Sequence, residues 1–232
     1  FNLKEFKKLD LYTDYYHVIS KKTEKKLQNL TDKKIFYSPF WIDSKKWYEI
    51  KNKSNLRRKY NFDDESFLIG SFQRDTEADR KTPKLEKGPD NLMKILLDYQ
   101  KKHKNLKVIL AGNRRDYLIK ELNENNISYS YFKMVEVKSL NELYNVLDLY
   151  IVSSRVEGGP QAILECASSK TPLISTDVGV AGEILSSESI FMMNNYLEAK
   201  PNVDYAYEKV TKHFIPNGFN NFLVNFKDIY ED

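Results

Sequence analysis

The segment from Glu157 to Glu165, which reads EGGPQAILE, carries the residues best suited to chemistry. Its Gly-Gly-Pro turn follows a short apolar run and precedes residues that favour a helix. Glycines let a ligand approach the backbone, and proline suits the first turn of a helix, where its missing N–H costs nothing. The free amides and positive end of such a helix attract anions. The segment predicts a phosphate site, although a turn without a ligand fits Gly-Gly-Pro alone equally well.

The two glutamates of this segment lie on either side of the turn. Glu165 is five residues into the expected helix, roughly 7–8 Å beyond the turn at a rise of ~1.5 Å per residue. Glu157 and Glu165 are therefore expected to contact opposite ends of one elongated ligand rather than to share a proton. The small and apolar neighbours of Glu165 indicate a largely buried helix, and a buried glutamate requires a partner. The alternative is an ordinary solvated glutamate.

A long charged connection, QRDTEADRKTPKLEKGPD, runs from Gln73 to Asp90. Loops longer than about 12–15 residues in compact domains are usually functional or disordered. This loop follows the carboxyl end of an expected strand, where open parallel sheets bind their ligands. A ligand-binding loop and a solvated insertion are equally good interpretations of these residues alone.

Short apolar strands are expected to alternate with amphipathic helices, which is typical of a parallel sheet. The predicted strands are Tyr16–Ser20, Lys34–Phe40, Phe67–Phe72, Lys107–Ala111, Ser128–Phe132, Leu149–Ser153 and Pro172–Ser175. The predicted helices are Lys21–Leu30, Asn91–Lys102, Arg115–Asn123, Leu140–Val146, Pro160–Ser168, Val203–His213 and Phe219–Tyr230. The charged stretch Ser44–Asn55 is predicted to be a linker that Trp41 and Trp47 anchor. The expected fold is α/β, with a Rossmann-like parallel sheet and flanking helices.

Size and composition limit the classes of protein. The 232 residues suffice for one large domain, or for one domain and a fragment, and the net charge is only +4. Mixed charges without a basic face argue against a nucleic-acid partner and leave peripheral membrane contact open. Cys166 is the only cysteine, which favours a reducing, cytoplasmic location and a buried inert thiol. No apolar run reaches the ~18 residues needed to span a bilayer.

Several motifs occur in a specific order. The spacing Glu157-x7-Glu165 around Gly-Gly-Pro is followed by PLIST from Pro172 and by GVAGE from Gly179. Together they resemble the C-terminal domain of retaining GT-B glycosyltransferases, and most closely the GT4 family (glycosyl transferases group 1). The resemblance extends from about Ile35 to about Ile190 and includes FLIGSFQRD, KLEKGPDNL, VILAGN and LNELYNVLDLYIVSSRVEGGPQAILE.

The resemblance implies roles for these residues. Glu157 would contact the donor sugar, and Glu165 would hold the nucleotide ribose. Arg74 and Lys87 stand where the family clamps the diphosphate, so the expected catalytic residues are Glu157, Arg74 and Lys87. The remaining residues expected to bind the donor are Gly158, Gly159, Pro160 and Gln161, together with Gly112 in a reduced Gly-x-Gly pattern. The family commonly needs no metal, and neither an Asp-x-Asp motif nor a His cluster occurs.

The chain also departs from the family pattern. Arg74 and Lys87 are unusually far apart, which leaves Arg80, Lys81 and Lys84 as rival cations. Residues 1–50 are expected to be a linker and a remnant of the N-terminal acceptor domain, and residues 51–232 the nucleotide-sugar-binding domain with its C-terminal helices. The first residue is Phe1, which is expected for a piece of a longer protein or a processed start.

The leading hypothesis is the donor-binding half of a retaining hexosyltransferase. Its donor would be a nucleotide-diphosphate sugar, and its acceptor a carbohydrate, lipid or protein. A non-catalytic nucleotide-sugar-binding module and a GT-B-fold nucleotide-sugar epimerase are the alternatives. A glycoside hydrolase has two carboxylates that lie ~5–9.5 Å apart across a water-filled cleft. One glutamate on a buried helix beside a Gly-Gly-Pro anion site fits that arrangement poorly. The three histidines, His17, His103 and His213, are interpreted as structural or surface residues rather than bases.

Overall fold

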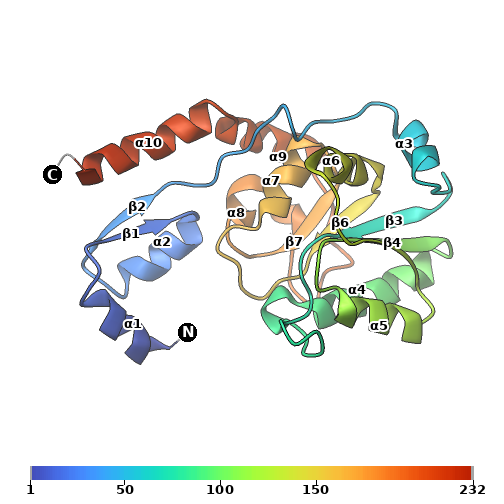
Figure 1. Cartoon of the computed structure of the whole chain (residues 1–232), viewed down its shortest axis with the longest axis horizontal. Helices are drawn as coiled ribbons and strands as arrows, with labels where there is room; N and C mark the ends of the chain where they lie inside the picture. The colour runs from blue at the N-terminus through green and yellow to red at the C-terminus, as the bar shows by residue number, and fades with distance from the viewer. Residues whose placement is uncertain (1, 231–232) are drawn as a thin grey trace.

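The computed structural model describes residues 2–230 and contains a six-stranded parallel sheet (Figure 1). Its strand order is β5-β4-β3-β6-β7-β8. The bounds are Phe67–Ser71 for β3, Leu106–Ala111 for β4, Ser128–Phe132 for β5, Leu149–Val152 for β6, Leu173–Thr176 for β7 and Ile190–Phe191 for β8. The expected α/β fold with a Rossmann-like parallel sheet is confirmed. Its central strands are apolar on both faces because helices cover both.

Two apolar clusters lie on opposite faces of this sheet. One face packs against α3 (Lys53–Lys59), α6 (Val137–Val146), α7 (Gln161–Ser168), α8 (Ala181–Ile184) and α9 (Val203–Val210). The other packs against α4 (Pro89–Lys102) and α5 (Asp116–Glu124). Neighbouring strand residues such as Leu68 and Ile69 belong to different clusters, as the alternation of a strand requires. Cys166 is buried in the first cluster, and this burial raises the pKa of its thiol well above the ordinary value.

The N-terminal segment forms a separate small unit. It consists of α1 (Leu3–Asp10), β1 (Tyr15–Val18), α2 (Lys21–Gln28) and β2 (Lys34–Tyr37), and the two strands pair in parallel with each other. The last helix, α10 (Asn217–Tyr230), runs back along this unit (Figure 1). Its Phe222 packs on Trp41 and His17, and Asn225 donates to the carbonyl of Tyr37 at 2.9 Å. The last helix therefore returns to the N-terminal segment and packs on it.

Several short elements differ from the sequence-based predictions. α1, α3, α8 and β8 were not predicted, and α3 occupies part of the expected linker. α4 begins at Pro89, two residues before the predicted start, because Gly88 in the left-handed region ends the preceding turn. The two anchoring aromatics are confirmed, since Trp47 packs on Tyr144 with ring centroids 5.8 Å apart and Trp41 packs on α10. Within residues 2–230, no helix has the length and apolarity required to cross a bilayer.

Candidate functional site

The connection between β6 and α7 carries Glu157 and the Gly-Gly-Pro turn. Pro160 is the N-cap of α7, with φ −63° and ψ 113°, and the helix begins at Gln161. The first amides of α7 therefore point toward the carboxyl end of the sheet, where parallel sheets bind ligands. Gly179, with φ +51°, lies against this turn, and a Cβ there would stand 2.6 Å from the carbonyl oxygen of Gly158. Only glycine fits this approach of the two loops.

A second glycine joins the long loop to the end of β6. Gly88 has φ +60°, and a Cβ on it would lie 2.0 Å from the backbone oxygen of Ser153. The Ser153 hydroxyl donates to the Gly88 carbonyl at 2.8 Å. The backbone of the loop is thereby held against the residues that lead to Glu157. This contact places Lys87 beside Glu157, although 70 positions separate them in the sequence.

Lys87 and Glu157 form a bidentate ion pair. The Lys87 ammonium donates to both carboxylate oxygens of Glu157, at 2.6 Å each. The Glu157 side chain is only 10% exposed, so the pair is largely removed from water. Ser154 donates to Glu157 at 3.0 Å, and the Gln73 amide donates to the backbone oxygen of Lys87 at 3.0 Å. Neutral neighbours thus orient the Glu157 carboxylate and the backbone of Lys87.

Glu165 has a different environment. Its carboxylate accepts one hydrogen bond, from the Tyr144 hydroxyl at 2.7 Å. Burial raises the pKa of Glu165, and the Tyr144 hydrogen bond opposes this rise in part. Burial also raises the pKa of Tyr144 well above its ordinary value, so Tyr144 is the donor. The expectation that a buried glutamate here needs a partner is confirmed.

Both glutamates line one cavity of about 360 Å³. Its wall consists of Phe72, Gln73, Lys87, Leu140, Tyr144, Tyr150, Glu157, Gly159, Pro160, Gln161, Ala162 and Glu165. A larger cavity of about 510 Å³ lies at α10 and has no lining residue in common with this one. The smaller cavity combines a cation, two carboxylates and a helix N-terminus.

The structure brings most of the predicted donor-binding residues together, but not all of them. Arg74 is exposed and does not line the cavity. Gly158 faces Ile19 of the N-terminal segment, whose Cδ1 would lie 3.6 Å from a Cβ at that position. Gly112 lies past the end of β4, where its carbonyl accepts from Tyr131 at 3.0 Å. Of the predicted cations, Lys87 alone lines the cavity in the described part of the chain.

The long loop is folded rather than a solvated insertion. Thr76 and Pro83 form an antiparallel bridge, and Arg115 and Asp75 form a buried ion pair at 2.8 Å that joins the loop to α5. Two of the rival cations have carboxylate partners, since Arg80 pairs with Asp116 at 3.0 Å and Lys84 with Glu77 at 3.1 Å. Burial raises the pKa of Asp75 despite its arginine partner.

Sequence reasoning missed the supporting residues Gln73, Ser154 and Tyr144. Tyr144 belongs to the quoted LNELY motif, but nothing in its spacing indicates a contact with Glu165. Gln73 and Ser154 follow the ends of neighbouring strands β3 and β6. Polar residues directly after adjacent parallel strands are the signal that was available.

Comparison with known proteins places the chain among transferases. The family model described as "Glycosyl transferases group 1" matches residues 52–215. Comparison with the curated protein sequences gives no match. The matched range includes the long loop and the whole cavity wall described above.

Solved structures show the same fold. Sucrose-phosphate synthase from Thermosynechococcus elongatus is 15% identical, with a TM-score of 0.73 over 95% of this chain and 59% of that one. Anabaena HepE in complex with UDP-glucose is 13% identical, with a TM-score of 0.70 over 95% of this chain and 64% of that one. A glycosyltransferase from Rickettsia africae is 16% identical, with a TM-score of 0.70 over 93% and 63%. The chain thus spans less than two thirds of the length of these proteins.

Proposed function

This chain belongs to the family of glycosyl transferases group 1, and from that premise we propose that it is the donor-binding half of a retaining hexosyltransferase. The donor would be a nucleotide-diphosphate sugar, and the acceptor a carbohydrate, lipid or protein. A cytoplasmic location belongs to the same proposal, since a lone buried thiol suits a reducing compartment.

One observation carries the proposal: the cavity wall combines Lys87, the N-terminus of α7, Glu157 and Glu165. A cation and a helix N-terminus suit a diphosphate. Glu165, half-buried beside Tyr144, can accept hydrogen bonds from the vicinal hydroxyls of a ribose. Glu157 lies at the Lys87 end of the cavity and is assigned to the sugar.

These groups also account for the chemistry. When the bond between the anomeric carbon and the diphosphate oxygen breaks, negative charge develops on the departing nucleoside diphosphate. Lys87 and the α7 amides stabilise that charge. Retention without a protein nucleophile implies that the acceptor hydroxyl attacks from the same face and passes its proton to the departing phosphate. The proposal assigns no part to a metal, so chelation with EDTA should leave nucleotide affinity unchanged.

UDP-glucose is the first donor to test, because HepE was solved with UDP-glucose, with UDP, and with UDP and glucose. Isothermal titration with UDP, GDP, ADP and their glucose conjugates should identify one nucleotide that binds. We expect Glu165→Ala to weaken the binding of the free nucleotide and of its sugar conjugate equally. Glu157→Ala should mainly remove the extra affinity of the conjugate. Unchanged binding in both variants would contradict the assignment.

The alternatives predict different outcomes in an activity assay. A transferase releases UDP when an acceptor mixture is added, and an epimerase converts the sugar without releasing UDP. A binding module does neither, although it titrates with the same ligand. Anomeric NMR of the first product reports whether the configuration is retained.

A further inference from the structure

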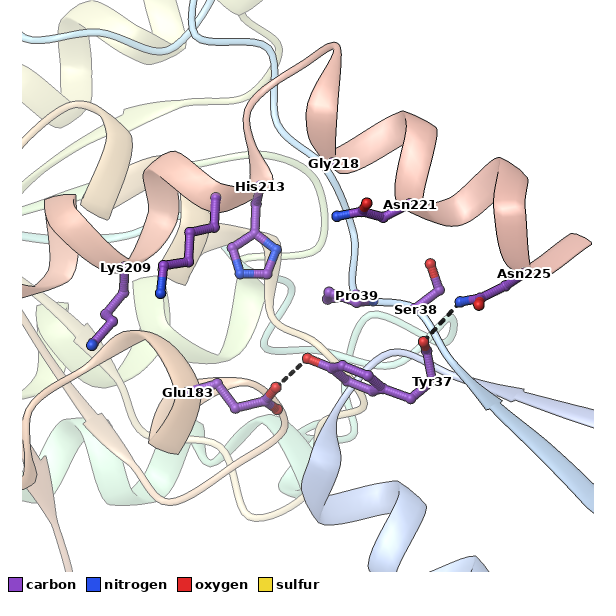
Figure 2. A pocket seen from close by; sticks show the side chains of 10 residues that line it. Tyr37, Ser38, Pro39, Glu183, Lys209, His213, Gly218, Asn221 and Asn225 are labelled. Carbon is purple, nitrogen blue, oxygen red and sulfur yellow. Dashed lines mark hydrogen bonds between the residues drawn. The ribbon is translucent and has the colours of Figure 1, made fainter.

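The larger cavity, of about 510 Å³, lies between the end of β2, α8, the turn after α9, and α10 (Figure 2). Volumes of roughly 300–1,000 Å³ are typical of small-molecule sites. None of the proposed donor-binding residues lines this cavity. Its polar groups come from elements at both ends of the sequence, which the return of α10 brings together.

A buried hydroxyl in its wall lacks a partner. Ser38 is 2% exposed, and its Oγ has no hydrogen-bond partner among the described residues. Leaving a buried hydroxyl unpaired is costly, and such groups in folded proteins usually mark a bound water, ion or ligand. In Figure 2 Ser38 lies between Tyr37 and Pro39, below Asn221 of α10.

Positive charge predominates around this hydroxyl. Lys212 has no hydrogen-bond or ion-pair partner within residues 2–230. Lys209 has a 3.9 Å contact with Glu208 and lies 4.9 Å from the centre of the Tyr205 ring. The His213 imidazole lies between Lys209 and α10 (Figure 2). The acidic residue of the wall, Glu183, already accepts from the Tyr37 hydroxyl and from the Lys21 amide at 2.8 Å. The two lysines are therefore left for an anion.

Two amides offer acceptors as well as donors. Asn225 donates its amide hydrogen to the carbonyl of Tyr37 at 2.9 Å, so its side-chain oxygen stays available. Asn221 lines the cavity without a hydrogen-bond partner in the described chain. Carbonyl oxygens of this kind accept hydrogen bonds from ligand hydroxyls.

We propose that this cavity is a second ligand site, which binds a small phosphate-bearing molecule with hydroxyl groups, such as a sugar phosphate. Lys209 and Lys212 hold the phosphate. Ser38, Asn221 and Asn225 hydrogen-bond the hydroxyl groups. This site is independent of the donor cavity and of the transferase activity.

The test uses the whole chain and the imidazole NMR signals of its three histidines. His213 lines the cavity, whereas His103 stacks on Phe67 with centroids 3.9 Å apart and His17 contacts Ser38 O at 3.0 Å. The probes are glucose 6-phosphate, inorganic phosphate and glucose. We expect glucose 6-phosphate to shift the His213 signal at a lower concentration than inorganic phosphate or glucose does. The His103 signal should stay unchanged. Equal shifts of His213 and His103, or no shift of either, would overturn the proposal.

Variants connect binding to the named groups. Lys212→Ala should lower the affinity for glucose 6-phosphate about tenfold, since it removes one charged hydrogen bond. Ser38→Ala should lower the affinity for glucose 6-phosphate but not the affinity for inorganic phosphate. It should leave the Tm of the ligand-free chain unchanged or raise it, because it deletes an unpaired hydroxyl. Lys104→Ala, an exposed lysine outside both cavities, is the matched control. Affinities that are the same in all three variants would show that the anion binds elsewhere.

Discussion

The two ends of the proposed donor cavity hold their glutamates in opposite ways. Glu157 is held by charge, in a bidentate pair with Lys87 at 2.6 Å. Glu165 is held by burial and by one neutral hydrogen bond from Tyr144. A diphosphate that contacts Lys87 competes with Glu157 for its ammonium, whereas the second end is already arranged to accept hydroxyl groups.

The Lys87 end of the cavity therefore recognises charge, and the Glu165 end recognises hydroxyl groups. At the Lys87 end, binding exchanges one ion pair for another, so its strength should depend on salt and on the charge of the ligand. At the Glu165 end, the protein has kept a carboxylate in an environment that disfavours its charge. Four substitutions can break or sharpen this contrast.

Gly88→Ala should have the largest effect. The new Cβ would meet the backbone of Ser153 at 2.0 Å in a left-handed conformation. We expect a loss of at least about 2 kcal/mol in the free energy of unfolding, because strain and steric overlap add. Urea denaturation measures it. Gly182→Ala is the matched control, since its nearest atom is 4.0 Å away, and an equal loss there would contradict the assigned role of Gly88.

Lys87→Ala should be next. It removes the cation from the diphosphate and leaves Glu157 unpaired at 10% exposure. UDP affinity is expected to fall about 10- to 100-fold, the equivalent of one or two charged hydrogen bonds. Titration calorimetry at two salt concentrations would show the salt dependence disappearing with the lysine. Lys84→Ala, in the same loop but paired with Glu77 and Glu86, should bind UDP as the wild type does.

Glu165→Gln should separate stability from binding. Burial raises the folded-state pKa of Glu165 above its ordinary value of 4.5, so the stability present below pH 4.5 is lost as pH rises through the folded-state pKa. At pH 7 the charge therefore opposes folding, and glutamine should raise the Tm by about 2–4 °C. UDP affinity should fall about tenfold.

The pH profile provides the control for Glu165→Gln. Wild-type affinity for UDP should decrease as pH falls toward 4.5, because protonation removes an acceptor for the ribose hydroxyls. The variant should lose this dependence. A wild-type profile that persists unchanged in the variant would assign the titration to another group.

Tyr144→Phe should have the smallest effect. It removes the hydrogen bond to Glu165, whose pKa then rises further, and UDP binding should weaken about fivefold at pH 7. Raising the pH should restore part of the affinity, which a purely structural role of the hydroxyl would not produce. Fluorescence titration between pH 5 and pH 8 measures this.

The sequence predicts the main elements of the sheet because their apolar runs are continuous and bounded by turns. It does not predict β8, which has only two residues, or the strand order, which depends on how the helices pack. α3 carries a readable signal, since Asn52 caps it by accepting from the Asn55 amide at 3.0 Å. The many charged residues around Asn52 favour the interpretation of this stretch as a linker instead.

The candidate site is predictable to a similar extent. The Glu157 to Glu165 spacing fixes the two carboxylates, because strand, turn and helix are contiguous there. The position of Lys87 depends on the left-handed Gly88 and on its contact with Ser153, 65 positions away. Only the fold brings these residues together. Arg74, which the family resemblance assigns to the diphosphate, is exposed and does not line the cavity, whereas its neighbour Gln73 does.

The return of α10 has a consequence for biosynthesis. The two strands of the N-terminal unit form an isolated pair, and two-stranded sheets are marginal by themselves. Their aromatic cover, Phe222 and its neighbours, is translated only after the entire six-stranded sheet. The strands β1 and β2 therefore gain this aromatic cover only after α10 has been synthesised, so their stable packing follows that of the six-stranded sheet.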